Sequence, residues 1–251
     1  YSMNIILLPA ANNTCSATFV TPNDPNFVTL DDPNVVQHLN HVLKVGVGDT
    51  VKVGEIEGRL GVATVAEVTA TQVVLSQIIL DQAPPPKLPL TVVLAIPRPK
   101  VLRRLFLDMT AMGVSDIYLV NSYRSEKSYW QTPLLNHIDT YIKEGLQQSC
   151  DTVFPRVHFK KRLKPFVEDE LPSVIEDAQA IIAHPYATAK FAEVWEANKP
   201  HVLVIGAEGG FIEYEVDLFV KAGCQTATLG ARILRTENAV SVLAGFALLQ
   251  A

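Results

Sequence analysis

The sequence is poor in the residues that mark several large classes of protein. Only three of its 251 residues are cysteines, and none of them forms a C-x-x-C pair, so neither a disulfide framework nor a metal site is indicated. No apolar run reaches the roughly 18 residues of a membrane-spanning helix, and we expect no membrane partner. Residues 1–9 are apolar but lack a basic flank. They are interpreted as a first strand and not as a signal peptide, which predicts a cytoplasmic protein.

An excess of positive charge is also missing. The 21 lysines and arginines are outnumbered by 26 acidic residues, giving a formal net charge of -5. A protein that coats nucleic acid through bulk electrostatics is therefore excluded, and an RNA substrate would need a local basic face. Two clusters could supply one, although solvated surfaces routinely produce such clusters. They are Arg98, Lys100, Arg103 and Arg104, and Lys160, Lys161, Arg162 and Lys164.

Proline is concentrated in one segment, which predicts a division of the chain. Four prolines lie within residues 82–89, where they favour a stiff extended connector over a helix or a central strand. We expect a domain over residues 1–81, a linker over 82–89 and a second domain over 90–251. In the first, a possible helix over 35–45 and short β-rich runs between glycines are typical of a small antiparallel barrel. Those runs are residues 50–53, 60–68 and 71–79.

The second part alternates apolar runs with longer helical segments, which predicts an α/β domain built on a parallel sheet. The expected strands cover residues 90–96, 117–120, 179–183, 202–205 and 226–229. The expected helices cover residues 100–112, 134–150, 213–222 and 236–250, the last begun by Thr236 as its N-cap.

A glycine-rich turn, Gly206–Gly210, directly follows the strand predicted over 202–205. Ligands of open α/β sheets bind at such strand ends, yet a single turn of this kind is as often a plain connector. The turn has neither a phosphate-loop lysine nor the Rossmann spacing. Both absences argue against a third possibility, a generic enzyme that binds ATP or NAD.

A second junction, Leu229–Ala239, places Arg235 and Glu237 just before an apolar helix. Alone, these two charges would suggest a surface salt bridge. Together with the glycine-rich turn, the junction resembles the RsmE family of SPOUT ribosomal RNA methyltransferases. The family text I-G-P-E-G-G and L-G-x-R-I-L-R-x-E-T appears here as IGAEGG at 205–210 and LGARILRTEN at 229–238. Weaker likenesses at 38–44, 122–125, 148–149 and 184–185 follow the order of the family.

The resemblance implies a PUA-like β-barrel for RNA contact, followed by a knotted SPOUT-type α/β domain that binds S-adenosylmethionine and forms a homodimer. It implies methylation of N3 of a uridine in 16S ribosomal RNA, with ribosomal RNA or the small ribosomal subunit as partner. The donor pocket carried over from the family comprises ten residues. They are His184, Pro185, Ile205, Gly206, Glu208, Gly209, Leu229, Gly230, Ile233 and Leu234.

The uridine N3 must lose its proton, so a base and a group that stabilises negative charge are needed. Glu237 as base and Arg235 as stabiliser are hypotheses that rest on their place beside the predicted pocket. Arg98, Arg124 and Lys44 are expected to contact RNA.

The chain also departs from the family. Ala207 stands where proline is common, Asn238 replaces a threonine, and family charges are missing in 108–114 and 147–151. The alternative is therefore an RNA-binding paralogue with lost or altered methyltransferase activity.

Overall fold

The computed structural model describes residues 3–10 and 27–250, and the chain divides into two compact units. The first is Tyr1–Pro85 with Lys143–Phe154, and the second is Pro86–Ile142 with Pro155–Ala251. The first break falls inside the proline segment. Lys143–Phe154 was expected in the second domain and groups instead with the first unit. This segment makes backbone hydrogen bonds with residues of the early strands and their connections.

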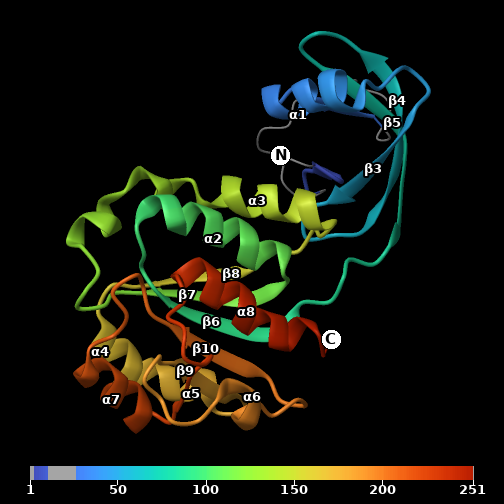
Figure 1. Cartoon of the computed structure of the whole chain (residues 1–251). Coiled ribbons are helices and arrows are strands. Elements are labelled where there is room, and N and C mark those ends of the chain that lie inside the picture. Colours follow the sequence, from blue (N-terminus) through green and yellow to red (C-terminus); the bar gives the residue numbers. More distant parts are fainter. Residues whose placement is uncertain (1–2, 11–26, 251) are drawn as a thin grey trace. The chain divides into compact units, whose positions relative to one another are not determined.

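The first unit contains a five-stranded sheet of order β1-β3-β4-β5-β2 (Figure 1). Its neighbouring strands are antiparallel, as expected, except for β1 and β3, which pair in parallel. Alternate residues such as Val53, Val65 and Leu75 are buried and form its core. The strands are β1 (Ile6–Leu8), β2 (Val28–Leu30), β3 (Thr50–Glu55), β4 (Leu60–Val68) and β5 (Val73–Gln82).

The helix expected over 35–45 forms as α1 (Pro33–Gln37), which continues directly into the π-helical turn η1 (His38–Leu43). Asp32 begins it by accepting hydrogen bonds from two backbone N–H groups. Lys44 ends it with a left-handed backbone at φ 52°.

Residues 143–154 are held to the first unit by backbone contacts. The N–H of Asn4 donates to the carbonyl of Gln147, and the N–H of Glu57 donates to the carbonyl of Thr152, both over 2.9 Å. A Cβ at Gly54 would lie 2.5 Å from the methyl group of Thr152, so only glycine fits on the strand at this position.

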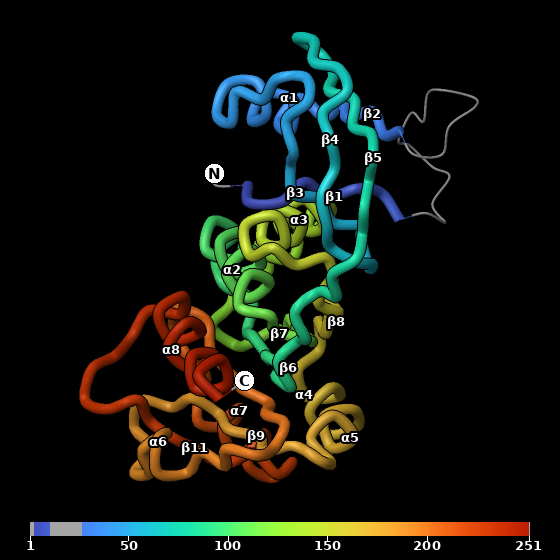
Figure 2. Tube along the Cα trace, turned by 90° about the vertical axis from the view of Figure 1, so that its right-hand side faces the viewer, coloured from blue at the N-terminus to red at the C-terminus, as the bar shows by residue number. Residues whose placement is uncertain are grey.

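The second unit is an α/β fold around a six-stranded, all-parallel sheet of order β11-β9-β10-β6-β7-β8. Figure 2 shows β7 and β8 toward one end of this sheet and β9 and β11 toward the other. The five expected strands are present. A sixth, β8, was not predicted. The strands are β6 (Leu88–Ala95), β7 (Val114–Val120), β8 (Arg156–Lys160), β9 (Gln179–Ala183), β10 (His201–Ile205) and β11 (Gln225–Ala227).

Pro89 lies within β6, a central strand, although the proline segment was expected to be a connector. The sheet accommodates it because the pairing of β6 with β7 is irregular between Leu88 and Thr91, and the pairing with β10 begins only at Leu90. A residue without an N–H is tolerated at such an irregularity.

Helices cover both faces of the sheet, and each face has its own hydrophobic core. Figure 1 shows α2 and α8 on one side of the sheet, with α4, α5 and α7 on the other. Phe106 and Leu243 are buried on the first side, and Phe166 and Phe219 on the second.

The helices are of unequal length, and the longer ones match the segments expected from the sequence. They are α2 (Pro99–Ala111), α3 (Ile138–Ser149), α4 (Leu163–Pro165), α5 (Leu171–Ile175), α6 (Phe191–Val194), α7 (Glu213–Lys221) and α8 (Thr236–Leu248). Shorter turns are η2 (Lys127–Gln131), η3 (Pro133–Asn136) and η4 (Phe166–Glu170). The helix expected over 134–150 is interrupted, because η3 ends before α3 begins. Thr236 is the first residue of α8, and the N-cap is Arg235, so the predicted cap was wrong by one residue.

Candidate functional site

A cavity of about 300 Å³ opens where three neighbouring strands end. β11, β9 and β10 are adjacent and parallel, so the segments that follow them gather at one edge of the sheet. Such an edge is the usual ligand site of an open α/β sheet. The lining residues fall in four groups: Ala183–Tyr186, Ile205–Phe211, the stretch from Thr228 to Ala239, and Arg124.

The turn after β10 needs glycine because its backbone folds closely upon itself. A Cβ at Gly206 would lie 2.9 Å from the Cα of Gly210, and Gly210 itself has a φ of +67°. The N–H of Gly210 donates to the carbonyl of Ala207 over 2.9 Å. The floor of the cavity is therefore main chain, which lets a ligand approach backbone groups directly.

The loop after β11 is tied to its neighbours through Thr228 and Thr236. The hydroxyl of Thr228 donates to the carbonyl of Pro185 over 3.3 Å and accepts from the N–H of Gly230 over 3.2 Å. The hydroxyl of Thr236 donates to the carbonyl of Gly206 over 3.3 Å. Between these ties, residues 231–235 are exposed, and Figure 2 shows the loop as a red-orange arc leading into α8.

Nine of the ten residues predicted for the donor pocket line this cavity, and Gly230 does not. Sequence reasoning missed several lining residues, although most lie next to predicted ones. Arg124 was expected to contact RNA and proves to be part of the cavity wall, where its guanidinium donates to the carbonyl of Gly209. The other missed residues are Ala183, Tyr186, Ala207, Gly210, Phe211, Thr228, Arg232, Thr236 and Ala239.

Neither predicted catalytic residue lines the cavity. Arg235 is exposed at the start of α8, and Glu237 is half-buried in its first turn. Thr236, between them, is the residue that reaches the cavity. The two charged side chains thus flank a lining residue.

Arg98 precedes α2 and is paired with Glu208 of the cavity wall. One carboxylate oxygen of Glu208 accepts from the Nε of Arg98 over 3.1 Å and from its backbone N–H over 3.2 Å. This hydrogen bond, followed by the carboxylate charge, raises the pKa of the Arg98 guanidinium, and the charge of Glu237 contributes in the same direction. Arg98 therefore lies beside the predicted cofactor turn, with Glu237 in electrostatic reach.

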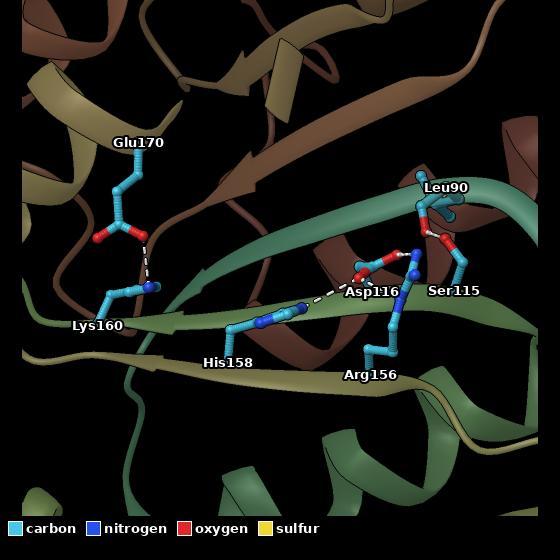
Figure 3. Close-up of polar contacts among 7 residues, drawn as sticks. All are labelled: Leu90, Ser115, Asp116, Arg156, His158, Lys160 and Glu170. Atoms are coloured by element: carbon cyan, nitrogen blue, oxygen red, sulfur yellow. Dashed lines mark hydrogen bonds and ion pairs between the residues drawn. The ribbon is translucent and has the colours of Figure 1, made fainter. Parts of the chain in front are cut away.

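Two of the four residues of the second basic cluster pair with acidic side chains, and Figure 3 shows one of these pairs. Lys160 on β8 contacts Glu170 over 2.5 Å, and Lys164 lies 3.7 Å from Glu168. Such pairing reduces the positive charge that the cluster can offer to a phosphate. This cluster is therefore a weak candidate for RNA contact.

The same strand carries a polar cluster around the buried Asp116, also drawn in Figure 3. Arg156 donates two hydrogen bonds, of 2.9 and 2.7 Å, to the carboxylate of Asp116 on β7, and the ring of His158 lies 3.1 Å from it. Tyr118 stacks on His158 with ring centroids 4.2 Å apart. These contacts join the edge strand to the sheet, away from the cavity.

The other predicted RNA contact, Lys44, is exposed in the first unit at the end of η1. Of the three cysteines, Cys224 is buried, Cys150 is half-buried and Cys15 lies outside the described residues. Within residues 3–10 and 27–250, no helix is both long and apolar enough to cross a membrane.

Comparison with known proteins gives a consistent result. The family model described as RNA methyltransferase domain matches residues 84–248. The protein named Ribosomal RNA small subunit methyltransferase E from Treponema pallidum (strain Nichols) is 29% identical over 213 residues, which cover 80% of this chain and 77% of that protein.

Two solved structures share the fold. A Ribosomal RNA small subunit methyltransferase E from Neisseria gonorrhoeae, bound to S-adenosyl methionine, matches with a TM-score of 0.71 and 23% identity over 99% of this chain and 97% of that one. The Legionella pneumophila protein Lpg2936, with the cofactor SAM bound, matches with a TM-score of 0.74 and 21% identity over 98% and 97%.

Proposed function

Because the chain belongs to the family described as RNA methyltransferase domain, we propose that it transfers the methyl group of S-adenosylmethionine to N3 of a uridine in 16S ribosomal RNA. The family membership confirms the resemblance to the RsmE family drawn from the sequence. One observation carries the proposal: the cavity at the ends of β9, β10 and β11 contains nine of the ten residues expected around the donor.

The chemistry of the cavity suits this donor. Ile205, Leu229 and Leu234 offer apolar surface to adenine and the thioether, while the turn after β10 offers backbone polar groups. A volume of about 300 Å³ is at the lower end of the range for small-molecule sites. The donor supplies a methyl group on an activated sulfonium. The part left to this chain is to hold donor and acceptor in line.

The acceptor side requires removal of the N3 proton of uridine. Glu237 serves as the base and Arg235 stabilises the developing negative charge; both flank the lining residue Thr236. The charge of Glu237 contributes to the raised pKa of Arg98, which itself pairs with Glu208 of the cavity wall, and this supports a place for Glu237 beside the cavity. Single-turnover methylation that survives in Glu237→Gln would remove Glu237 from this role.

RNA contact is assigned to Arg98, Arg124 and Lys44. Arg98 and Arg124 each hydrogen-bond the turn after β10, so a phosphate held by either would lie beside the cavity. We assign residues 1–81 to a PUA-like RNA-binding domain, 82–89 to a linker and 90–251 to a SPOUT domain, of which Lys143–Phe154 groups with the first compact unit. The substrate is ribosomal RNA or the small ribosomal subunit, and the compartment is the cytoplasm.

A knotted chain and a homodimer belong to the same proposal. After β11 at the edge of the sheet, the chain returns to pack α8 on β6 and β10, a path that a threaded loop would require. Val242 and Leu248 of α8 and its C-cap Leu249 are exposed apolar residues, and a second copy would bury them. The cavity shares Thr236 and Ala239 with this helix.

Calorimetric titration with S-adenosylmethionine and S-adenosylhomocysteine tests the donor site. Gly209→Val serves as the variant with a blocked cavity, because even a Cβ added at Gly209 would lie 3.0 Å from the side chain of Arg124. Saturable binding that the variant abolishes, followed by mapping of methylated uridines, would support the proposal. A folded protein that binds neither compound would favour the RNA-binding paralogue without transferase activity.

A further inference from the structure

Glu215 is a buried carboxylate that no catalytic or donor-binding role so far includes. It lies in the first turn of α7, and the residue is only 4% exposed. A buried carboxylate is costly unless hydrogen bonds satisfy it, so its partners indicate what it is for.

Both carboxylate oxygens of Glu215 accept hydrogen bonds from backbone N–H groups. One accepts from Ile212 over 3.0 Å, which caps α7 in the ordinary way. The other accepts from Tyr123 over 2.7 Å, in the loop after β7, 92 residues earlier in the chain. A single side chain thus joins the segment after β10 to the loop after β7.

The residue next to Tyr123 is Arg124, which lines the cavity and donates to the carbonyl of Gly209. The same loop is held from the other side by Ser125, whose hydroxyl donates to the carbonyl of Ile96 over 2.8 Å. Arg124 itself has an exposed side chain. Its position therefore depends on the backbone on either side of it.

We propose that Glu215 is a positioning residue, which fixes the Tyr123–Arg124 loop so that Arg124 closes one wall of the donor cavity. The inference takes only the identity of the ligand from the proposed function. A carboxylate is required because both partners are donors. Glutamine would offer one oxygen and set an N–H₂ group against the second N–H.

Limited trypsin digestion tests the loop without any ligand. Glu215→Gln is expected to raise the rate of cleavage after Arg124 about tenfold, since local opening exposes the bond. Glu213→Gln is the matched control, because Glu213 lies in the same turn of α7 and is exposed. Cleavage after Lys221, at the end of α7, reports loss of the helix instead. Unchanged cleavage after Arg124, or faster cleavage after Lys221 alone, would overturn the proposal.

Binding of S-adenosylhomocysteine to Glu215→Gln, Arg124→Ala and the double variant supplies the second test. Each single change is expected to raise the Kd about fivefold. The Kd of the double variant should be no higher than that of the single variant with the higher Kd. Effects that multiply would mean that Glu215 acts only on α7. If the unchanged protein binds no S-adenosylhomocysteine, the proposed function fails, and the digestion still decides the role of Glu215.

Discussion

The hydroxyl of Thr236, the first residue of α8, donates a hydrogen bond to the carbonyl of Gly206, 30 residues earlier in the chain. This contact fixes the start of α8 to the turn that forms the cavity floor. Thr236→Val removes the donor while keeping the volume. It is expected to weaken binding of S-adenosylhomocysteine by about fivefold, the equivalent of roughly 1 kcal/mol for one hydrogen bond. Calorimetry measures the change. Thr236→Ser keeps the hydroxyl and should bind as the unchanged protein does, so equal losses in both variants would contradict this account.

Gly206→Ala should be more damaging than an ordinary glycine substitution. Its Cβ would lie 2.9 Å from the Cα of Gly210 and 3.3 Å from the nitrogen of Phe211, so the turn must open. We expect binding of S-adenosylhomocysteine to fall more than tenfold, measured by calorimetry. Gly46→Ala is the control, because its Cβ would meet nothing closer than a carboxylate oxygen of Asp49 at 3.7 Å. Full binding by Gly206→Ala would show that the turn adapts.

Cys150→Gly should stabilise the protein. Cys150 follows α3 with a φ of 57°, a left-handed backbone that costs a residue with a Cβ roughly 1 kcal/mol. Glycine removes that cost, and Cys150→Ala does not. Urea unfolding of the two variants compares them directly, since both lack the thiol. Equal stability of the glycine and alanine variants would count against strain at this position.

The carboxylate of Asp116 should make stability depend on pH. Burial alone would raise the pKa of this carboxyl, but hydrogen bonds from Arg156 and His158 outweigh it and place the pKa below its ordinary value of 3.8. A carboxyl with a lowered folded-state pKa stabilises the protein above the ordinary value, and this stabilisation is lost as the pH falls through the folded-state pKa.

Asp116→Asn should therefore lower the free energy of unfolding at neutral pH, and the difference from the unchanged protein should shrink as the pH falls below 3.8. Urea unfolding across this range measures it. A difference that stays constant with pH would mean that packing, and not charge, explains the loss.

Val242→Glu tests the proposed homodimer. Val242 of α8 is 47% exposed. A glutamate in its place would become a buried charge in a dimer interface and would oppose association. Light scattering should show a species of twice 27.5 kDa for the unchanged protein and a 27.5 kDa monomer for the variant. Val220→Glu is the control, since Val220 has a similar exposure of 45% on α7. A monomeric unchanged protein would refute the dimer.

Much of the second unit follows from sequence because its central strands are continuous apolar runs. β10, with five buried residues in succession, is an example. β8 is an edge strand in which Arg156, His158 and Lys160 alternate with apolar residues, the period-two pattern of a half-buried strand. It was missed because it is only five residues long and ends in the second basic cluster. Pro89 was expected in a connector, because the sequence does not show that the pairing of β6 with β7 is irregular between Leu88 and Thr91.

The family resemblance led to nine of the residues that line the cavity, since the matching motifs are short contiguous segments that follow three strands. Arg124 was placed among the RNA contacts because nothing in its own segment shows that β7 ends near β10. Sheet order is a property of the whole fold, and β6 separates the two strands. Glu215 lies five residues after the glycine-rich turn, but its bond to Tyr123 depends on that same order.

The discontinuity of the first unit has a consequence for how the protein is made. A ribosome delivers Pro85 well before Phe154, so the early sheet emerges while Gly54, Gly58 and Asn4 still lack the partners that residues 147–152 provide. Those partners arrive only after β6, α2 and β7 have been synthesised. The first unit to begin folding is therefore completed by a segment translated in the middle of the second, which couples the order of assembly of the two.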